Sequence, residues 1–351
     1  MIDISGAKNV LESAIRARVF PAATVDVGSS AESLWSDALG TLTFDARSSP
    51  ADLRTPFDLA SLTKVIATTT VAMQLVSTGR LRLDEPVADS FADWRGDDRE
   101  AVTVRDLLEH ASGLAARLVD APPVSRTEFE HDICTMPLEY APRTRSIYSD
   151  LGFILLGFLV ADRGGAPLDA LFDDVMVRLK ADTTYRLATD AKLLAAPTLP
   201  MDDDVRRGRT LTGEVHDNYA AALGGVAGHA GLFGSAPAVG TFARAVLRAA
   251  RGDTQLASPF SPQQVAAFTT RTTVMGSSRA LGWDTMLPTS SCGTHMSARA
   301  FGHVGFTGTS LWIDPERDRY VVLLTNRACG GGTLDEMRAV RRAFHDALGD
   351  V

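Results

Sequence analysis

The chain has 351 residues, of which 45% are hydrophobic, and a formal net charge of −8 at pH 7. This length and apolar content allow a large core, and the absence of a block or stripe of lysine and arginine argues against a nucleic-acid-binding protein. The three cysteines, Cys134, Cys292 and Cys329, are odd in number and far apart. They favour neither a disulfide framework nor a zinc knuckle, and they fit a reducing compartment.

The N-terminal part of the chain predicts an amphipathic helix over residues 2–18, followed by short strands. These strands are expected at residues 21–28, 33–40 and 41–46. The N-terminal segment lacks the basic start and apolar run of a signal peptide, so we expect a cytoplasmic protein. A secreted protein trimmed of its signal would have the same sequence.

The middle of the chain predicts mostly helices. Helical periodicity extends over residues 61–78, 103–110, 150–163, 166–180 and 240–251. Gly79 follows the first of these helices as a C-cap, and Thr103 with Asp106 opens the second as a weak capping box. The longest apolar run, residues 151–161, is too short to span a membrane.

Strands return near the C-terminus and are followed by a last helix. They are expected at residues 280–285, 301–314 and 319–326. A "PERD" turn joins the last two strands as a hairpin, and Thr333 with Glu336 forms a capping box for the helix.

This order predicts an α+β fold, with an antiparallel sheet flanked by helices and an inserted, mostly helical lobe. We expect residues 1–68 and 270–351 to form one α/β lobe and residues 69–269 to form the helical lobe. The active site is expected between the two lobes.

The segment "FDLASLTK" places Ser61 and Lys64 three residues apart at the start of a helix, where both side chains share one face. The helix dipole and burial both disfavour a charged lysine there, so Lys64 is a candidate base for the Ser61 hydroxyl. Ser5 and Lys8 match the same pattern on a predicted surface helix, where an ordinary N-cap serine is sufficient. The Ser-x-x-Lys spacing alone therefore does not identify a catalytic site, and further residues are needed to complete one.

Two further segments supply such residues. Tyr148 in "IYSDLGF" precedes an apolar helix, where its phenol either projects into a cleft or packs at the edge of the core. Strand alternation places His303 and Gly305 of "FGHVGFTGTS" on one face, as part of a site or as a half-buried histidine on a glycine-weakened strand. Each pattern alone is common. The occurrence of Ser-x-x-Lys, Tyr-Ser-Asp and His-x-Gly in this order along one chain is much less probable by chance.

The combination resembles the serine β-lactamase and penicillin-binding-protein superfamily. It is closest to the class C β-lactamase-like branch, which includes D-alanyl-D-alanine carboxypeptidases and family VIII carboxylesterases. Residues 79–91, 103–114, 228–236 and 305–315 are also similar to this branch. The resemblance implies that Ser61 is acylated, that Lys64 accepts its proton, and that Tyr148 shares the base role and passes a proton to the leaving group. It also implies an oxyanion hole formed by the backbone N–H groups of Ser61 and Phe306.

The chain departs from this family pattern at two positions. His303 stands where the family usually has the lysine of Lys-Thr-Gly, and a neutral imidazole supplies no full charge for a substrate carboxylate. Arg327 either compensates for the missing charge or is a solvated arginine at a strand end.

Asp150 stands where many relatives have the asparagine of Tyr-x-Asn. A carboxylate there only accepts hydrogen bonds, favours protonated Lys64 and moves base duty towards Tyr148. Both departures favour an esterase that acts on small esters or amides. D-Ala-D-Ala carboxypeptidase or β-lactamase activity is the alternative. The base for deacylation is either Tyr148 or His303.

Three other functions are alternatives: a metal-dependent hydrolase, a nucleotide-binding protein and a scaffold without catalytic activity. His216, Asp217 and His229 offer ligands to a metal, but no H-E-x-x-H or similar spacing occurs. His216 or Asn218 either lines the cleft or only stabilises its own loop. The chain lacks a nucleotide-binding glycine motif and a Gly-x-Ser-x-Gly elbow.

We therefore expect no metal or other cofactor and no nucleic acid. The expected partner is a small ester, amide or peptide-like molecule. A non-catalytic scaffold of the same fold is the remaining alternative.

Overall fold

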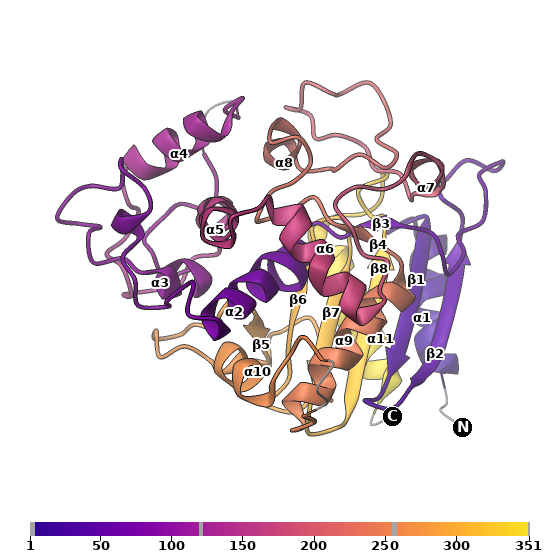
Figure 1. The fold of residues 1–351 in the computed structure, drawn as a ribbon. Helices are drawn as coiled ribbons and strands as arrows, with labels where there is room; N and C mark the ends of the chain where they lie inside the picture. The colour runs from indigo at the N-terminus through magenta and orange to yellow at the C-terminus, as the bar shows by residue number, and fades with distance from the viewer. Residues whose placement is uncertain (1–3, 119–121, 255–257, 350–351) are drawn as a thin grey trace.

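The computed structural model describes residues 4–118, 122–254 and 258–349 and is built around a six-stranded antiparallel sheet (Figure 1). The strand order is β2-β1-β8-β7-β6-β5. The strands are β1 (Ala22–Gly28), β2 (Ser33–Gly40), β5 (Asp284–Thr285), β6 (Phe301–Val304), β7 (Ser310–Asp314) and β8 (Arg319–Thr325). Because β1 pairs with β8, the two ends of the chain meet in the middle of the sheet. The predicted fold class is confirmed.

Helices cover both faces of this sheet. Helices α1 (Ser5–Arg16) and α11 (Leu334–Leu348) pack together on one face, and α9 (Ala236–Ala250) packs on the other. Strand β8 shows why: Val321 and Leu323 join the cluster of α1 and α11, whereas Val322 and Leu324 join the larger core. Alternate side chains of a strand point to opposite faces, so a wholly buried strand needs apolar residues at every position.

The remaining elements lie mostly between β2 and β5 in the sequence. They are β3 (Phe57–Asp58), η1 (Lys64–Thr68), α2 (Thr69–Ser77), η2 (Val87–Asp89), α3 (Val104–Leu108), α4 (Arg126–Thr135), α5 (Asp150–Gly164), α6 (Leu168–Leu179), α7 (Thr189–Leu194), α8 (Asn218–Ala222), β4 (Phe233–Gly234) and α10 (Pro262–Thr269). In the described part of the chain, no single helix is long and apolar enough to cross a membrane; only α5 and α6 together, bent by 75°, reach that length and composition. The boundaries of the two predicted lobes stay a prediction.

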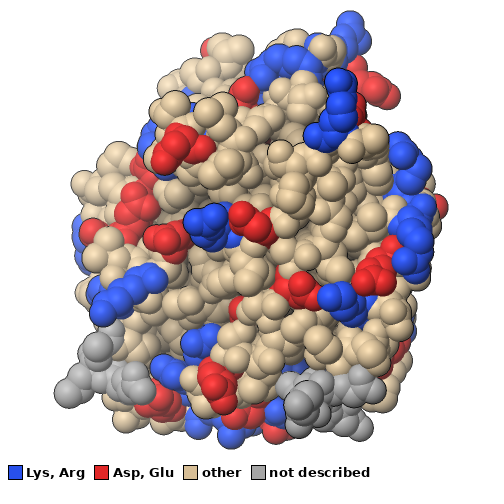
Figure 2. Space-filling model, turned by 90° about the vertical axis from the view of Figure 1, so that its right-hand side faces the viewer, with Lys and Arg blue, Asp and Glu red and all other residues tan. Residues whose placement is uncertain are grey.

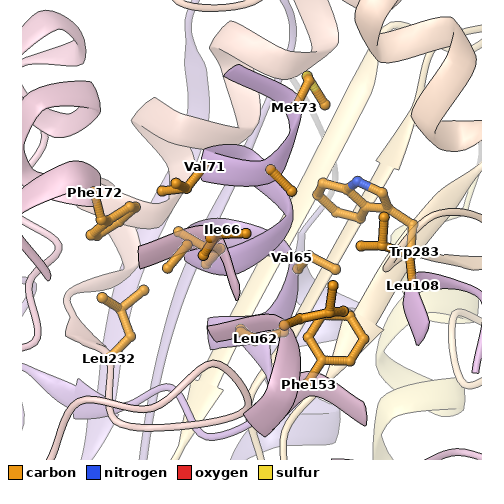
Figure 3. Close-up of a cluster of buried hydrophobic side chains, with 14 of the residues drawn as sticks. Leu62, Val65, Ile66, Val71, Met73, Leu108, Phe153, Phe172, Leu232 and Trp283 are labelled. Atoms are coloured by element: carbon orange, nitrogen blue, oxygen red, sulfur yellow. The ribbon is translucent and has the colours of Figure 1, made fainter. Parts of the chain in front are cut away.

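The helix that follows Ser61 is held by the core on several sides (Figure 3). Leu62, Val65 and Ile66 are fully buried, and Phe153 of α5 and Trp283 pack in the same cluster. Burial of each such side chain contributes roughly 2 kcal/mol. Ser61 therefore sits at the end of an element that packing holds in place.

Glycines bring α5 close to the loop before β4. An added Cβ at Gly228 would lie 2.0 Å from the Phe153 carbonyl oxygen and 2.7 Å from the Gly157 nitrogen. The two backbones therefore touch directly, and only glycine permits this approach. The contact matters for the site because α5 and this loop each supply one acceptor to Lys64.

The predicted strand at residues 41–46 is wrong. Thr41 makes only an isolated bridge to Pro50, and the residues between form turns. The Ser48 hydroxyl accepts from the Thr43 N–H at 2.9 Å, and the Asp45 carboxylate accepts from the Arg47 N–H at 2.8 Å. Such local side-chain bonds compete with a strand ladder for the backbone.

The predicted strand at residues 301–314 is in fact the hairpin of β6 and β7. The Gly305 N–H donates to the Thr309 carbonyl at 2.8 Å, and Gly308 has a φ of +110°, which favours glycine. Gly305 therefore lies in the turn rather than on a strand face with His303. The predicted strand at residues 280–285 is reduced to β5, because Gly282 turns the chain with a φ of +82°.

Most other predicted elements are confirmed within a few residues, and residues 2 and 3 of the first predicted helix lie outside the described part. On the molecular face in Figure 2, basic and acidic side chains are intermixed. That face carries no continuous basic surface.

Candidate active site

A tight turn presents Ser61 at the start of its helix. Ala60 has a φ of +47°, a conformation that non-glycine residues rarely adopt. The buried Asp58 carboxylate stabilises this turn, because it accepts from the Ala60 N–H at 2.8 Å and from the His216 N–H at 2.6 Å. A π turn follows, closed by a bond from the Thr69 N–H to the Lys64 carbonyl.

Lys64 is fully buried below Ser61. Its Nζ lies 3.0 Å from Ser61 Oγ, 2.8 Å from Asp150 Oδ1 and 3.1 Å from the His229 carbonyl oxygen. An ammonium group has three protons, and these three acceptors take all of them. Burial lowers the pKa of Lys64, but the negative charge and hydrogen bond of Asp150, together with Tyr148, outweigh it, so the net pKa is raised. The resting lysine is therefore a cation.

Lys64 belongs to a chain of alternating charges. The other oxygen of Asp150 pairs with Arg117 Nη1 at 3.0 Å, and Arg117 pairs with Asp217 at 3.0 Å. Asp217 in turn accepts from His229 Nε2 at 2.8 Å. Burial opposes ionisation of Asp217, but His229 and Arg117 hold its pKa well below the ordinary value. The two cations and two carboxylates balance one another.

Tyr148 lies directly before α5, with its ring beside the ammonium group. Lys64 Nζ is 4.7 Å from the ring centroid, and the ring stacks against His110 and His303 with centroids 4.8 and 5.8 Å away. Burial raises the pKa of Tyr148, and although the positive charge of Lys64 opposes this, the net pKa stays raised. At neutral pH Tyr148 is therefore a neutral phenol, which can donate a proton.

His303 is neutral and its tautomer is fixed. Its Nδ1 lies 2.9 Å from the Val304 carbonyl, which only accepts, so Nδ1 carries the proton. Burial, together with the charges of Arg279 and Lys64, keeps the pKa of His303 well below its ordinary value. Nε2 has no hydrogen-bond partner among the described residues. His303 thus brings no positive charge to the position of the family's lysine.

The backbone N–H groups of Ser61 and Phe306 are both free to bind an oxyanion. Neither donates a hydrogen bond within residues 4–118, 122–254 and 258–349. Both residues line a pocket of about 410 Å³, together with Tyr148, Asp150 and Gly305. An added Cβ at Gly305 would lie 2.8 Å from the Leu59 carbonyl, so this glycine lets the β6–β7 turn approach the turn of Ser61. The pocket volume suits a small molecule.

The pocket is lined by Arg279 and not by Arg327, the arginine that the sequence suggested. Arg327 does not line the pocket; its guanidinium group donates to the carbonyls of Phe306, at 2.6 and 3.1 Å, and of Gly332. Arg279, which the sequence analysis missed, lines the pocket and lies 5.1 Å from the Tyr148 ring. Within the described part of the chain, its guanidinium group has no acidic partner.

Of His216 and Asn218, the two residues considered for lining the cleft, only His216 reaches the pocket. His216 lines it, with its ring 5.2 Å from that of Phe306, whereas Asn218 lies behind and accepts from Arg117 Nη2 at 2.7 Å. Among the described residues, no three His, Cys, Asp or Glu side chains are grouped as a metal site. His229 and Asp217 bind each other, and the ring of His216 packs on Phe306.

The second Ser-x-x-Lys pair lies far from this site. Lys8 of α1 pairs with Asp37 at the surface, with an Nζ–Oδ2 distance of 2.9 Å. Other residues of the site had no sequence signal of their own: Asp58, Arg117, Arg279 and Arg341. Only Asp58 stood inside a segment already singled out, three residues before Ser61.

Comparisons with known proteins identify relatives that match most of the chain. The sequence model of the Beta-lactamase family matches residues 11–345. N-acetylmuramyl-L-alanine amidase of Bacillus subtilis (strain 168) is 33% identical over 304 residues, which cover 78% of this chain and 68% of the relative. A protein of Escherichia coli (strain K12), provisionally named D-alanyl-D-alanine carboxypeptidase, is 33% identical over 306 residues, 78% of this chain and 69% of that protein.

A solved structure shares the fold. EstCE1, described as a hydrolase with promiscuous acyltransferase activity, superposes with a TM-score of 0.78 at 18% identity. The match covers 98% of this chain and 97% of EstCE1. At this identity the likeness concerns the fold alone.

Proposed function

This chain belongs to the Beta-lactamase family and is a serine hydrolase, and we propose that Ser61 is the residue acylated during its reaction. One observation carries this proposal: Ser61 Oγ lies 3.0 Å from Lys64 Nζ, in a pocket where two backbone N–H groups are free. A nucleophile, a proton acceptor and an oxyanion hole thus converge on one small volume.

Lys64 is the proton acceptor for acylation. The reactive form is the fraction of molecules in which the ammonium group has released one proton to solvent. Asp150 and the His229 carbonyl keep the other two protons, because neither group can donate. The lone pair then faces Ser61 Oγ. As Oγ bonds to the substrate carbonyl carbon, its proton moves to Lys64, and the carbonyl oxygen becomes an oxyanion between the N–H groups of Ser61 and Phe306.

Tyr148 is the proton donor for the leaving group. Its raised pKa keeps the phenol protonated, and it lies beside both Ser61 and Lys64. When the tetrahedral intermediate collapses, the leaving oxygen or nitrogen takes the phenolic proton, and Lys64 returns a proton to Tyr148. Water then attacks the acyl-serine, and its proton goes either to Nε2 of His303 or through the Tyr148 phenol, which passes its own proton on to the neutral Lys64 amine.

The pocket favours a small ester or amide as substrate. Both oxygens of Asp150 are engaged by cations, so this position offers no donor to an acylamino carbonyl. Apolar side chains make up much of the lining: Ala60, Ala116, Met201, Val304, Phe306 and Leu334. Such a surface binds a short acyl chain without a specific polar partner.

A substrate with a free carboxylate is the second candidate. Arg279 supports it, because an arginine without an acidic partner lines the pocket that holds Ser61. Guanidinium groups bind carboxylates through two parallel hydrogen bonds. Names of the curated relatives, an amidase and a carboxypeptidase, point to amide or peptide substrates of those proteins.

Intact-protein mass spectrometry tests the nucleophile. Wild type, Ser61→Ala and Ser5→Ala are each mixed with p-nitrophenyl butyrate, a fluorophosphonate and a penicillin. We expect an adduct on wild type and on the control Ser5→Ala, which lacks only the serine of the second Ser-x-x-Lys pair, and no adduct on Ser61→Ala. An unlabelled wild type without ester turnover would refute the proposal and favour the scaffold.

Two esters separate the substrate candidates. One is p-nitrophenyl butyrate, and the other is the p-nitrophenyl monoester of glutaric acid, which carries a free carboxylate. If the second candidate holds, Arg279→Gln raises KM for the charged ester by about tenfold and leaves the neutral ester unchanged. Equal effects on both esters would favour the neutral substrate.

A further inference from the structure

Arg341 of α11 is buried directly behind the β6–β7 turn. The residue is 5% exposed, and Nη2 donates to the carbonyl oxygens of Gly305, at 2.8 Å, and Thr309, at 2.9 Å. Nε has no hydrogen-bond partner among the described residues. Arg341 also lines the pocket of Ser61.

The geometry of the peptide unit links Arg341 to the oxyanion hole. In a planar trans peptide, the carbonyl of one residue and the N–H of the next point in opposite directions. Because Arg341 holds the Gly305 oxygen, the N–H of Phe306 is turned to the other side of that peptide. Arg327 holds the next carbonyl, that of Phe306, so both peptides that flank Phe306 are fixed by guanidinium groups.

The positive charge of Arg341 has no acidic partner in the described residues. Burial, together with the charge of Arg327, lowers the pKa of Arg341 to about 9, so the group remains a cation at neutral pH. Burying an unpaired cation destabilises the fold. A buried cation beside the pocket therefore indicates a role in the reaction that offsets this cost. An anion that forms during the reaction would meet this charge.

We infer that Arg341 is a positioning residue for the oxyanion hole: it fixes the peptide of Gly305 and Phe306 and places a positive charge behind it. The inference rests on the proposed acylation of Ser61. The tetrahedral intermediate bears its negative charge on the former carbonyl oxygen, and a cation in a water-poor site stabilises that charge more than it stabilises the neutral ester.

Three variants test this role: Arg341→Met, Arg341→Lys and Arg342→Met. Arg342 is the matched control, because it lies on the same helix but donates to the carbonyls of Pro288 and Ser290. The fraction of competent protein is first counted by complete labelling with a fluorophosphonate. The rate of p-nitrophenyl butyrate hydrolysis per labelled site is then measured, together with Ki for phenylboronic acid, which forms an anionic tetrahedral adduct on serine.

For Arg341→Met we expect kcat per site to fall by roughly thirtyfold, somewhat less than after loss of an oxyanion-hole donor itself, with KM changed less than about threefold. Ki for the boronic acid should rise by a similar factor. Arg341→Lys keeps the charge and should recover part of both losses, and Arg342→Met should match wild type.

The inference is overturned if Arg341→Met or, should that variant not fold, Arg341→Lys equals wild type in rate per labelled site and in boronate Ki. Loss of labelled fraction alone, with normal rates in what remains, would mean a structural role only. If wild type itself is not labelled on Ser61, the proposed function fails and this inference falls with it.

Discussion

Asp150→Asn removes one negative charge from beside the buried Lys64 and changes few atoms. In wild type, Lys64 and Arg117 face Asp150 and Asp217, so the charges balance. In the variant, two cations face one carboxylate. The amide oxygen still accepts from Lys64, but it no longer supplies a full charge.

The size of the effect follows from the distance. Two unit charges 2.8 Å apart interact by about 6 kcal/mol at an effective dielectric constant of about 20. Removing one partner of a buried pair usually costs about 3–5 kcal/mol, because the remaining charge relaxes or loses its proton. Asp150 is 13% exposed at its side chain, so we expect destabilisation of about 3 kcal/mol at pH 7.

The sign of the pH dependence follows from the raised pKa of Lys64. In wild type, the ion pair stabilises the fold fully below the ordinary lysine pKa and is lost as pH rises through the folded value. Without Asp150, burial dominates and lowers the pKa of Lys64. The amine is then present at lower pH, so the alkaline rise of the acylation rate should move towards neutral pH.

Urea unfolding and stopped-flow acylation by p-nitrophenyl butyrate, both across pH, measure these two effects. Asp162→Asn is the control, because it removes a carboxylate from a surface pair with Arg126, which should cost at most about 1 kcal/mol. In a Lys64→Met background, Asp150→Asn should lose most of its cost. An Asp150→Asn variant as stable as the Asp162→Asn control, with an unmoved acylation profile, would refute the account of Lys64.

Three further variants test other parts of the molecule. Gly228→Ala should lower stability by about 3 kcal/mol in urea unfolding, because its Cβ would meet the Phe153 carbonyl at 2.0 Å, whereas Gly6→Ala, with only ordinary contacts at 3.6 Å, should be nearly neutral. Tyr148→Phe should slow hydrolysis of ethyl butyrate much more than that of p-nitrophenyl butyrate, whose leaving group needs no proton; equal losses would contradict the role of proton donor. Burial raises the pKa of Asp58 from 3.8 to about 6, so the folded state gains stability as pH falls from 7 to 4. Asp58→Asn should remove about 3 kcal/mol of that gain, and a pH-independent difference from wild type would disprove the shift.

Sequence patterns predicted the parts of the site that depend on local spacing. Ser61 and Lys64 meet because three residues of helix place them on one face, and their 3.0 Å contact needs no distant part of the chain. The effect of Asp150 on Lys64 was also predictable, since a carboxylate two residues after Tyr148 stands at a known place in the pattern. Its direction, a raised pKa of Lys64, agrees with the structure.

Residues that reach the site from distant segments had no such signal. Arg117 meets Asp217 across 100 residues, and Arg341 reaches Gly305 from a helix whose sequence looks like any amphipathic surface. For the positive charge that could bind a substrate carboxylate, the sequence suggested Arg327 instead of Arg279. The only available criterion was that Arg327 follows the last strand directly in the sequence. The strand errors have a related cause: apolar alternation continues through the Gly305 turn, so periodicity alone hides it.

The turn of Ser61 and the hairpin of β6 and β7 are held together by two threonine hydroxyls. Thr307 Oγ1 donates to the Asp58 carbonyl across 249 residues, and Thr309 Oγ1 donates to the Leu59 carbonyl across 250. Contacts between such distant segments close large loops and form slowly during folding. The proposed nucleophile and the second proposed oxyanion donor therefore meet only after these two distant segments have come together, so a partly folded molecule would carry Ser61 and Lys64 without a complete oxyanion site.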